Sequence, residues 1–205
     1  MIETRNEKRD TRGEMEREVA ACRSLFEKKT RDYGTSWRIM RLPSLTDQIF
    51  IKANRIRSVQ ESGENRVGDG LRGEFVAMVN YCVMALIQCE MLDTNRETAL
   101  ADEDLAAHFT RLSTQMSVEE ALSLYDWHIE RVLKLMLDKN HDYGEAWRKM
   151  RTSSITDIIL MKLLRIKQIE DHNGKTIISE GLDANYYDII NYAVFALIQL
   201  DEQKQ

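Results

Sequence analysis

The chain has 205 residues, of which 43% are hydrophobic and 31% charged, and its formal net charge is −5. A sizeable core is therefore possible, while the acidic balance argues against general nucleic-acid binding, which needs a concentrated basic face. The sequence also shows no apolar run near the roughly 18 residues of a membrane span and no apolar signal segment, and its three cysteines lack metal-binding spacing. We therefore expect a cytoplasmic protein that is not bound to a membrane.

Apolar residues recur at helical spacing along most of the chain, and no stretch alternates with the period of a strand. The sequence thus predicts an all-α protein. In chain order, we expect a helix over about 8–30, a glycine break and a short turn, a helix over about 44–60, and a third helix from about residue 70. This third helix is apolar on most sides and should be the most buried one. The connector over 93–116 is polar, with a short helix expected around 100–109.

The second half repeats the first. Residues 32–56 match residues 142–166 at 14 of 25 positions without a gap. A period near 110 residues is too long for a solenoid unit and indicates a duplicated domain. We define repeat 1 as residues 1–92 and repeat 2 as residues 117–205, the latter opened by a predicted capping box at Ser117.

A three-helix unit with an apolar central helix leaves one of its faces uncovered. Packing of one copy against the other is the simplest cover, so we expect a pseudo-two-fold helical bundle, an intramolecular counterpart of a homodimer. The sequence leaves further oligomerisation open.

One aromatic motif occurs once in each repeat. It comprises Lys29, Tyr33, Gly34 and Trp37 in repeat 1 and Lys139, Tyr143, Gly144 and Trp147 in repeat 2. The Tyr and Trp are four residues apart and could sandwich a planar ring such as a nucleobase, and the Lys could meet a phosphate. The alternative is a helix end with Gly in the left-handed cap position, where the aromatic rings seal a corner between helices.

Charged residues recur on the second helix of each repeat. Asp47 and Asp157 follow Ser44 and Ser154 by three residues, so each is either a functional carboxylate or a helix cap. Two cation pairs follow them, and these pairs suit a phosphate and internal carboxylates equally well. The pairs are Lys52 with Arg55 and Lys162 with Arg165.

The third helix of each repeat carries an asparagine in the middle of an apolar run, Asn80 or Asn191. A buried amide is costly unless it is hydrogen-bonded, so it either binds a ligand or joins two helices. Glu74 in repeat 1 and Asp188 in repeat 2 each supply one member of a Glu-x-x-Asp pattern, which suits Mg²⁺ when both members are present. Neither repeat has both.

Together these motifs resemble the nucleotide-modification-associated domain 1 family, over about 25–92 and 135–203. More distantly, they resemble the MazG-like all-α nucleoside triphosphate pyrophosphatases, in which Glu and Asp on paired helices hold Mg²⁺ that activates water. Carried over, the resemblance makes Glu74 and Asp188 metal ligands and catalytic residues, together with Asp47 and Asp157. The Glu-x-x-Glu pair expected on the preceding helix is missing.

Two functions follow as hypotheses. The first is metal-dependent hydrolysis of a nucleoside phosphate, with Glu74 and Asp188 meeting in one composite site. It predicts carboxylates from at least two helices converging with the cation pairs in one cleft. The second is a non-catalytic module that binds a nucleotide or scaffolds an assembly. It predicts that Asp47 and Asp157 cap their helices and that neighbouring carboxylates neutralise the cation pairs.

Overall fold

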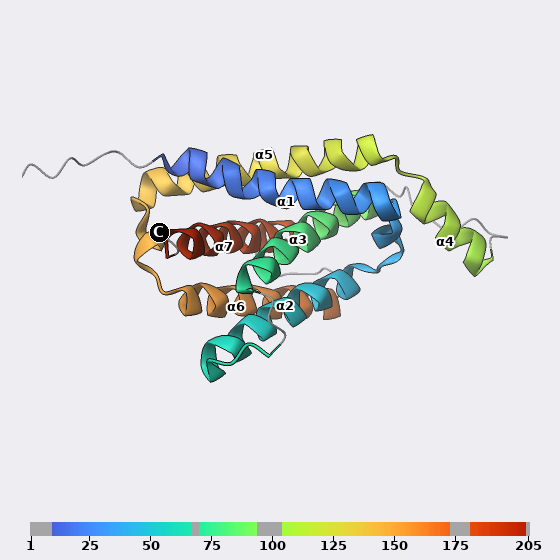
Figure 1. Ribbon diagram of the computed structural model, residues 1–205. Helices are drawn as coiled ribbons and strands as arrows, with labels where there is room; N and C mark the ends of the chain where they lie inside the picture. The colour runs from blue at the N-terminus through green and yellow to red at the C-terminus, as the bar shows by residue number, and fades with distance from the viewer. Residues whose placement is uncertain (1–9, 67–69, 94–103, 173–180, 204–205) are drawn as a thin grey trace, which may run out of the picture.

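The computed structural model describes residues 10–66, 70–93, 104–172 and 181–203 (Figure 1). Every regular element in these ranges is helical, which confirms the predicted all-α class. The elements are α1 (Thr11–Tyr33), η1 (Ser36–Ile39), α2 (Leu42–Ser62), α3 (Leu71–Asp93), α4 (Leu105–Thr114), α5 (Val118–Tyr143), η2 (Ala146–Lys149), α6 (Thr152–Asp171) and α7 (Leu182–Glu202).

Several helix ends follow directly from local sequence. The Ser117 hydroxyl accepts a hydrogen bond from the Glu120 amide at 3.1 Å, which confirms the predicted start of α5. Gly144 ends α5 in the left-handed cap conformation that the sequence predicted, with φ of 57° and ψ of 40°. Gly34 also follows its helix with a positive φ of 63°, but its ψ of −153° is outside the left-handed helical region, so the predicted cap is not formed there.

The predicted starts of α2 and α6 were wrong. These helices begin at Leu42 and Thr152, each two residues before the predicted serine, and neither has a side-chain cap. In α2, Pro43 occupies the first turn, where its missing N–H costs nothing. Asp47 and Asp157 consequently lie more than one turn inside their helices, so the prediction that they act as caps is also wrong.

The boundaries of other elements also moved. The connector helix α4 spans Leu105–Thr114 rather than 100–109, because Asp104 caps it by accepting from the Ala107 amide at 2.8 Å. The first helix ends at Tyr33, three residues later than predicted. Its predicted start at residue 8 and part of the predicted connector lie outside the described residues.

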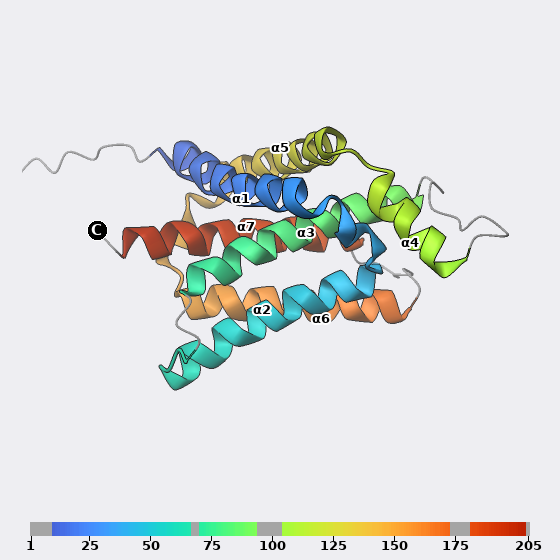
Figure 2. The same ribbon diagram turned by 45° about the vertical axis from the view of Figure 1, so that its right-hand side comes forward.

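The helices form three layers (Figures 1 and 2). The central layer consists of α3 and α7, with α1 and α5 on one side and α2 and α6 on the other. Corresponding helices of the two repeats contact each other, α1 with α5, α2 with α6 and α3 with α7. In addition, α1 contacts α7 and α5 contacts α3. Each of these contacts made by a helix of repeat 1 thus has a counterpart made by the equivalent helix of repeat 2, as a pseudo-dimer requires. The two-fold rotation axis between the repeats stays a prediction.

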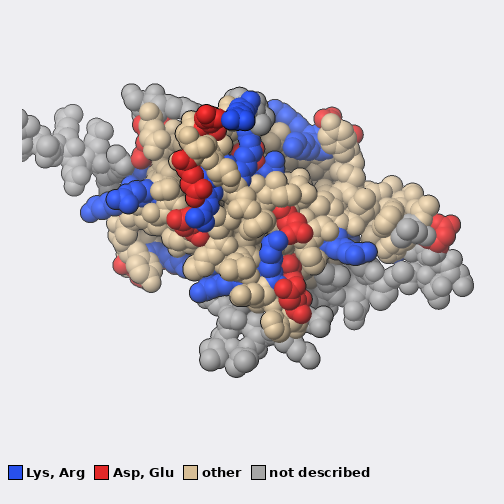
Figure 3. Space-filling model, turned by 90° about the horizontal axis from the view of Figure 1, so that it is seen from below, with Lys and Arg blue, Asp and Glu red and all other residues tan. Residues whose placement is uncertain are grey.

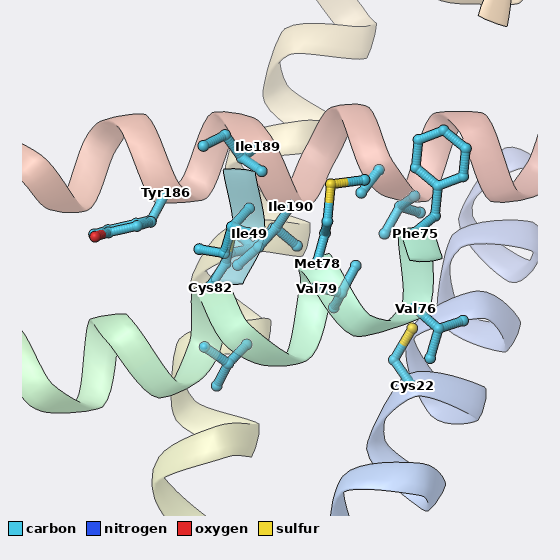
Figure 4. Packing of buried hydrophobic residues seen from close by; sticks show 14 of the residues in the cluster. Cys22, Ile49, Phe75, Val76, Met78, Val79, Cys82, Tyr186, Ile189 and Ile190 are labelled. Carbon is cyan, nitrogen blue, oxygen red and sulfur yellow. The ribbon is translucent and has the colours of Figure 1, made fainter. Parts of the chain in front are cut away.

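One hydrophobic core joins both repeats, as Figure 4 shows around α3 and α7. Its largest fully buried side chains include Phe26 and Phe75 of repeat 1 and Tyr125 and Tyr186 of repeat 2. Each such side chain contributes about 1.5–3 kcal/mol on burial. Among the described long helices, α3 and α7 have the largest shares of buried residues, which confirms the prediction that the third helices are the most buried. This burial fixes the position of the polar residues they carry.

Helix α3 is more apolar than we expected from the sequence. Among the described helices, α3 over Leu71–Met91 is long and apolar enough to cross a membrane, with a mean hydropathy of 1.3. However, 67% of that window is buried against other helices. The expectation that no segment is long and apolar enough to span a membrane was thus wrong. In this structure α3 is a core helix.

Candidate ligand-binding pocket

A pocket of about 290 Å³ opens among α5, η2 and α7 of repeat 2. This volume is at the lower end of small-molecule sites and matches a ligand of nucleobase to nucleoside size. Eleven residues line it: Met136, Lys139, Asn140, Tyr143, Ala146, Trp147, Met150, Asp188, Asn191, Tyr192 and Phe195. The structure therefore brings together five residues that the sequence analysis selected, namely Lys139, Tyr143, Trp147, Asp188 and Asn191.

The indole of Trp147 forms a fixed wall of this pocket. It stacks on Phe195 with ring centres 4.3 Å apart and an interplanar angle of 6°, while the Arg148 guanidinium lies 4.4 Å from the same indole centre. Two groups cannot share one face at these distances, so both faces of Trp147 are covered. In this arrangement a ligand meets the edge of Trp147, and Tyr143, which is 74% exposed at the pocket, supplies an accessible ring.

The polar groups of the pocket include amide atoms without partners. Asn191 is only 4% exposed, and within the described residues neither its amide nitrogen nor its amide oxygen has a hydrogen-bond partner. The amide nitrogen of Asn140 is likewise buried and unpaired, while its oxygen accepts from the Trp147 indole at 3.1 Å. An unpaired buried polar group costs about 1–3 kcal/mol. These atoms are therefore poised to bond a ligand or water.

The corresponding asparagine of repeat 1 is fully paired. Asn80 donates to the Cys22 carbonyl at 3.1 Å and accepts from the Tyr125 hydroxyl at 2.9 Å. The position equivalent to Tyr125 in repeat 1 is Met15, which has no hydroxyl to offer Asn191. Joining of helices is thus confirmed for Asn80, whereas Asn191 keeps its amide available.

A compact ion cluster lies at one end of the pocket. The Asp188 carboxylate accepts hydrogen bonds from Lys139 at 2.8 Å and from Lys162 at 2.6 Å. Burial alone would raise the pKa of Asp188, but the two ammonium groups outweigh it, so the pKa is lowered and the group is ionised. Lys162 is itself buried, which makes the cluster part of the packed structure.

Repeat 1 contains a related cluster one turn earlier on its third helix. Glu74 is bonded to Arg55 and lies 3.2 Å from the Lys52 ammonium. In Figure 4, Phe75 of α3 and Tyr186 of α7 lie at opposite ends of the contact between these helices, which run antiparallel. The structure therefore places Glu74 and Asp188 in two different clusters, each paired with cations of its own repeat.

The donor sets of these clusters do not suit Mg²⁺. A divalent cation of this kind takes oxygen ligands, whereas each carboxylate here already faces two cationic side chains. Among the described residues, no group of three or more His, Cys, Asp or Glu side chains could hold a metal ion. Binding of Mg²⁺ by Glu74 or Asp188 would require the cations to move away, and it stays a prediction.

The remaining predicted residues lie away from the pocket. Asp47 is exposed and bonded to Lys167, and Asp157 is exposed with its carboxylate 3.8 Å from Arg57. Figure 3 shows the outer side of α2 and α6, where basic and acidic side chains are intermixed. Three further predicted residues are exposed and one is buried: Lys29, Tyr33 and Arg165 are exposed, and Trp37 is buried.

The sequence analysis missed the residues that hold the two short turns. Gln199 donates to the carbonyls of Trp147 and Met150 at 3.0 and 2.9 Å, and Gln88 donates to the carbonyls of Arg38 and Met40 in repeat 1, both at 2.9 Å. Both end the repeated pattern Val-x-Ala-Leu-Ile-Gln, which was a usable signal. Asn140 gave no such signal, because the equivalent residue of repeat 1 is Thr30.

The fold and the pocket define an all-helical tandem-repeat protein with a small-molecule-sized site in its second repeat. Two segments of the chain, 29–89 and 139–200, match the family described as nucleotide modification associated domain 1. Because these segments make up more than half of the chain, the protein belongs to this family, as the repeated motifs predicted. No curated protein and no solved structure gives a match. The similarity to MazG-like enzymes stays a prediction.

Proposed function

We propose that repeat 2 binds a nucleoside or nucleoside monophosphate in the pocket among α5, η2 and α7, and that it does so without hydrolysing it. The observation that carries this proposal is the unpaired amide of Asn191, buried in a pocket with aromatic walls. The membership of the family associated with nucleotide modification supports the same class of ligand.

The polar atoms of the pocket complement a nucleobase edge. A carboxamide presents one donor and one acceptor side by side, which is how asparagine makes bidentate contacts with a base. The nitrogen of Asn140 adds a second donor. The exposed ring of Tyr143 would stack on the base, an interaction worth about 1–3 kcal/mol per base in single-strand binding proteins.

The ion cluster complements the rest of such a ligand. The Asp188 carboxylate would accept a hydrogen bond from a sugar hydroxyl, since an ionised carboxylate can accept more bonds than the two it receives from lysines. Lys139, whose side chain is 48% exposed, would turn towards a phosphate at the pocket mouth. Lys162 is buried and would remain on Asp188, so the cluster keeps its charge balance.

The arrangement of charges supports binding over hydrolysis. The binding hypothesis expected neighbouring carboxylates to neutralise the cation pairs, and Lys52, Arg55 and Lys162 are paired in this way. The hydrolysis hypothesis expected carboxylates from two helices in one cleft, yet Asp188 faces lysines and Asp157 is on the outer surface. Metal-dependent hydrolysis accordingly stays an untested prediction.

The proposal is tested with purified protein and a panel of nucleosides and their mono-, di- and triphosphates, with and without Mg²⁺. We expect at least one nucleoside or monophosphate to raise Tm without Mg²⁺, and calorimetric titration to give one ligand per chain. Asn191→Leu should abolish this shift. Product formation is followed in the same samples, and we expect none. The proposal fails if no member of the panel binds, if Asn191→Leu binds as well as the wild type, or if hydrolysis occurs.

A further inference from the structure

Arg148 joins three segments that are far apart in the chain, namely its own turn, the start of α1 and the end of α7. Its guanidinium donates to Glu145 at 2.8 Å, to Glu202 in the last turn of α7 at 2.8 Å, and to Thr11 in the first turn of α1 at 2.9 Å, and it also bonds Glu14 of α1. The Arg148 side chain is only 10% exposed. Such charge-assisted bonds between a planar guanidinium and several carboxylates hold the group in one orientation.

The same guanidinium covers one face of Trp147, a wall of the pocket. Trp147 lies on a four-residue turn, η2, that is preceded by Glu145 with φ of 57°, a left-handed conformation that residues other than glycine rarely adopt. Glu145 is held there by bonds to Arg148 and to Thr11. The position of the pocket wall therefore depends on contacts made at the start of α1.

The equivalent arginine of repeat 1 has a different role. Arg38 is buried, donates to Gln88 of its own repeat at 2.6 Å and lies 5.9 Å from the centre of the Trp37 indole. Arg148 instead binds Thr11 and Glu14, which belong to the other repeat. Arg38 does interact electrostatically with Glu120 of repeat 2, but its hydrogen bond to Gln88 stays within its own repeat, whereas Arg148 forms hydrogen bonds across the repeats.

We propose that Arg148 is a positioning residue for the pocket of repeat 2, and that the first turn of α1 in repeat 1 braces the Trp147 wall through it. Without this brace, the bonds from Gln199 still hold the carbonyls of Trp147 and Met150, but η2 becomes more mobile and the edge of Trp147 closes the pocket less completely. The effect on ligand affinity rests on the proposed function, whereas the effect on the wall does not.

The test uses full-length protein in which the carboxylates of the brace are neutralised, Glu14→Gln with Glu202→Gln, since neither residue lines the pocket. Glu16→Gln is the matched control, because Glu16 lies on the same helix but pairs with Arg12. Amide hydrogen exchange over residues 143–151 reports the wall, with exchange over residues 49–56 of α2 as the internal reference. The nucleosides and nucleoside monophosphates are titrated separately to report the pocket.

In the double variant, we expect exchange over 143–151 to become at least tenfold faster while exchange over 49–56 is unchanged. Affinity for the nucleoside or nucleoside monophosphate that binds the wild type should fall about tenfold. The control should match the wild type in both measurements. If hydrogen exchange over 143–151 is unchanged, Arg148 does not brace the Trp147 wall. If exchange is faster but the affinity is unchanged, the brace has no role in ligand binding. If the wild type binds no nucleoside and no nucleoside monophosphate, the proposed function fails and the exchange result alone decides the brace.

Discussion

The buried asparagines of the central helices, Asn80 and Asn191, occupy the same position in their repeats but differ in hydrogen bonding. Asn80 is bonded to Cys22 and Tyr125, whereas Asn191 has no partner among the described residues. Identical residue types at equivalent positions thus have opposite energetic consequences. The exchange of a tyrosine for a methionine on the neighbouring helix explains why the amide oxygen of Asn191 lacks the donor that Asn80 has.

This difference predicts opposite effects of the same substitution. Asn80→Leu leaves the Tyr125 hydroxyl without its acceptor, removes the bond to the Cys22 carbonyl, and should lower the free energy of unfolding by about 1–3 kcal/mol. Asn191→Leu removes two unpaired polar atoms and should leave stability unchanged or raise it by about 1 kcal/mol. Urea unfolding of both variants without ligand checks this. Equal destabilisation by the two substitutions would show that Asn191 is paired in solution.

His128 is a second residue whose burial has a measurable consequence. It is 3% exposed, with its ring 3.5 Å from the Glu90 carboxylate and 3.5 Å from the Tyr187 hydroxyl. Burial and, secondarily, the charge of Arg131 lower the pKa of His128 to about 4, from an ordinary value of 6.5. The imidazole is therefore neutral in the folded protein at neutral pH.

Because the pKa of His128 is lower in the folded than in the unfolded state, the unfolded state binds the extra proton as pH falls. The stability contributed by neutral His128 is complete above about pH 6.5 and should be lost as pH falls towards 4. The loss is on the order of 2–3 kcal/mol, from the free energy of one pKa unit. Unfolding free energies of the wild type and of His128→Gln between pH 4 and 7 test this. A slope that is the same in both proteins would contradict it.

At the level of elements, the short turns η1 and η2 depend on helices that follow them much later in the chain. A four-residue 3₁₀ turn has too few internal bonds to be stable alone. Gln88 of α3 and Gln199 of α7 supply bonds to its carbonyl groups. Gln199 also accepts from Thr152 at 2.9 Å and so ties η2 to the start of α6.

Removal of this glutamine should therefore loosen one wall of the pocket. Gln199→Ala leaves buried carbonyls of Trp147 and Met150 without their donor and should destabilise the protein by about 2 kcal/mol. Gln203→Ala, at an exposed position four residues later, is the matched control and should have little effect. Thermal unfolding measures both. A loss in the control as large as that of Gln199→Ala would show that the end of α7, rather than the turn, is affected.

At the level of the whole molecule, the two repeats are held together by a shared core. The central helices α3 and α7 pack against each other, and α1 crosses over to contact α5 and α7. A repeat taken alone would expose the apolar face of its central helix. Apolar surface on this scale drives association or prevents folding.

We therefore predict that a fragment comprising repeat 2, residues 117–205, does not form a folded monomer. It should either self-associate, with one fragment replacing repeat 1 for the other, or remain largely unfolded. Sedimentation velocity and circular dichroism distinguish these outcomes. A helical, cooperatively unfolding monomer of the fragment would show that each repeat carries an independent core.

The sequence by itself determined the class, the duplication, the glycine breaks and the capped start of α5, because periodicity and capping depend on neighbours in the chain. It also selected five residues of the pocket, since both copies retain a lysine, a tyrosine, a tryptophan and an asparagine at equivalent positions, and a single aspartate completed the set.

Only the tertiary structure decided which copy keeps an unpaired amide, which cations neutralise Glu74 and Asp188, and how Arg148 connects the repeats. These outcomes depend on groups more than 40 residues apart, or on different helices, that meet through packing. Local propensity is also too weak to decide where α2 and α6 begin, so the packing of their apolar faces places those starts two residues before the predicted serines. Residues at equivalent positions in the two repeats therefore differ in their hydrogen bonds and ion pairs, because different side chains pack around them.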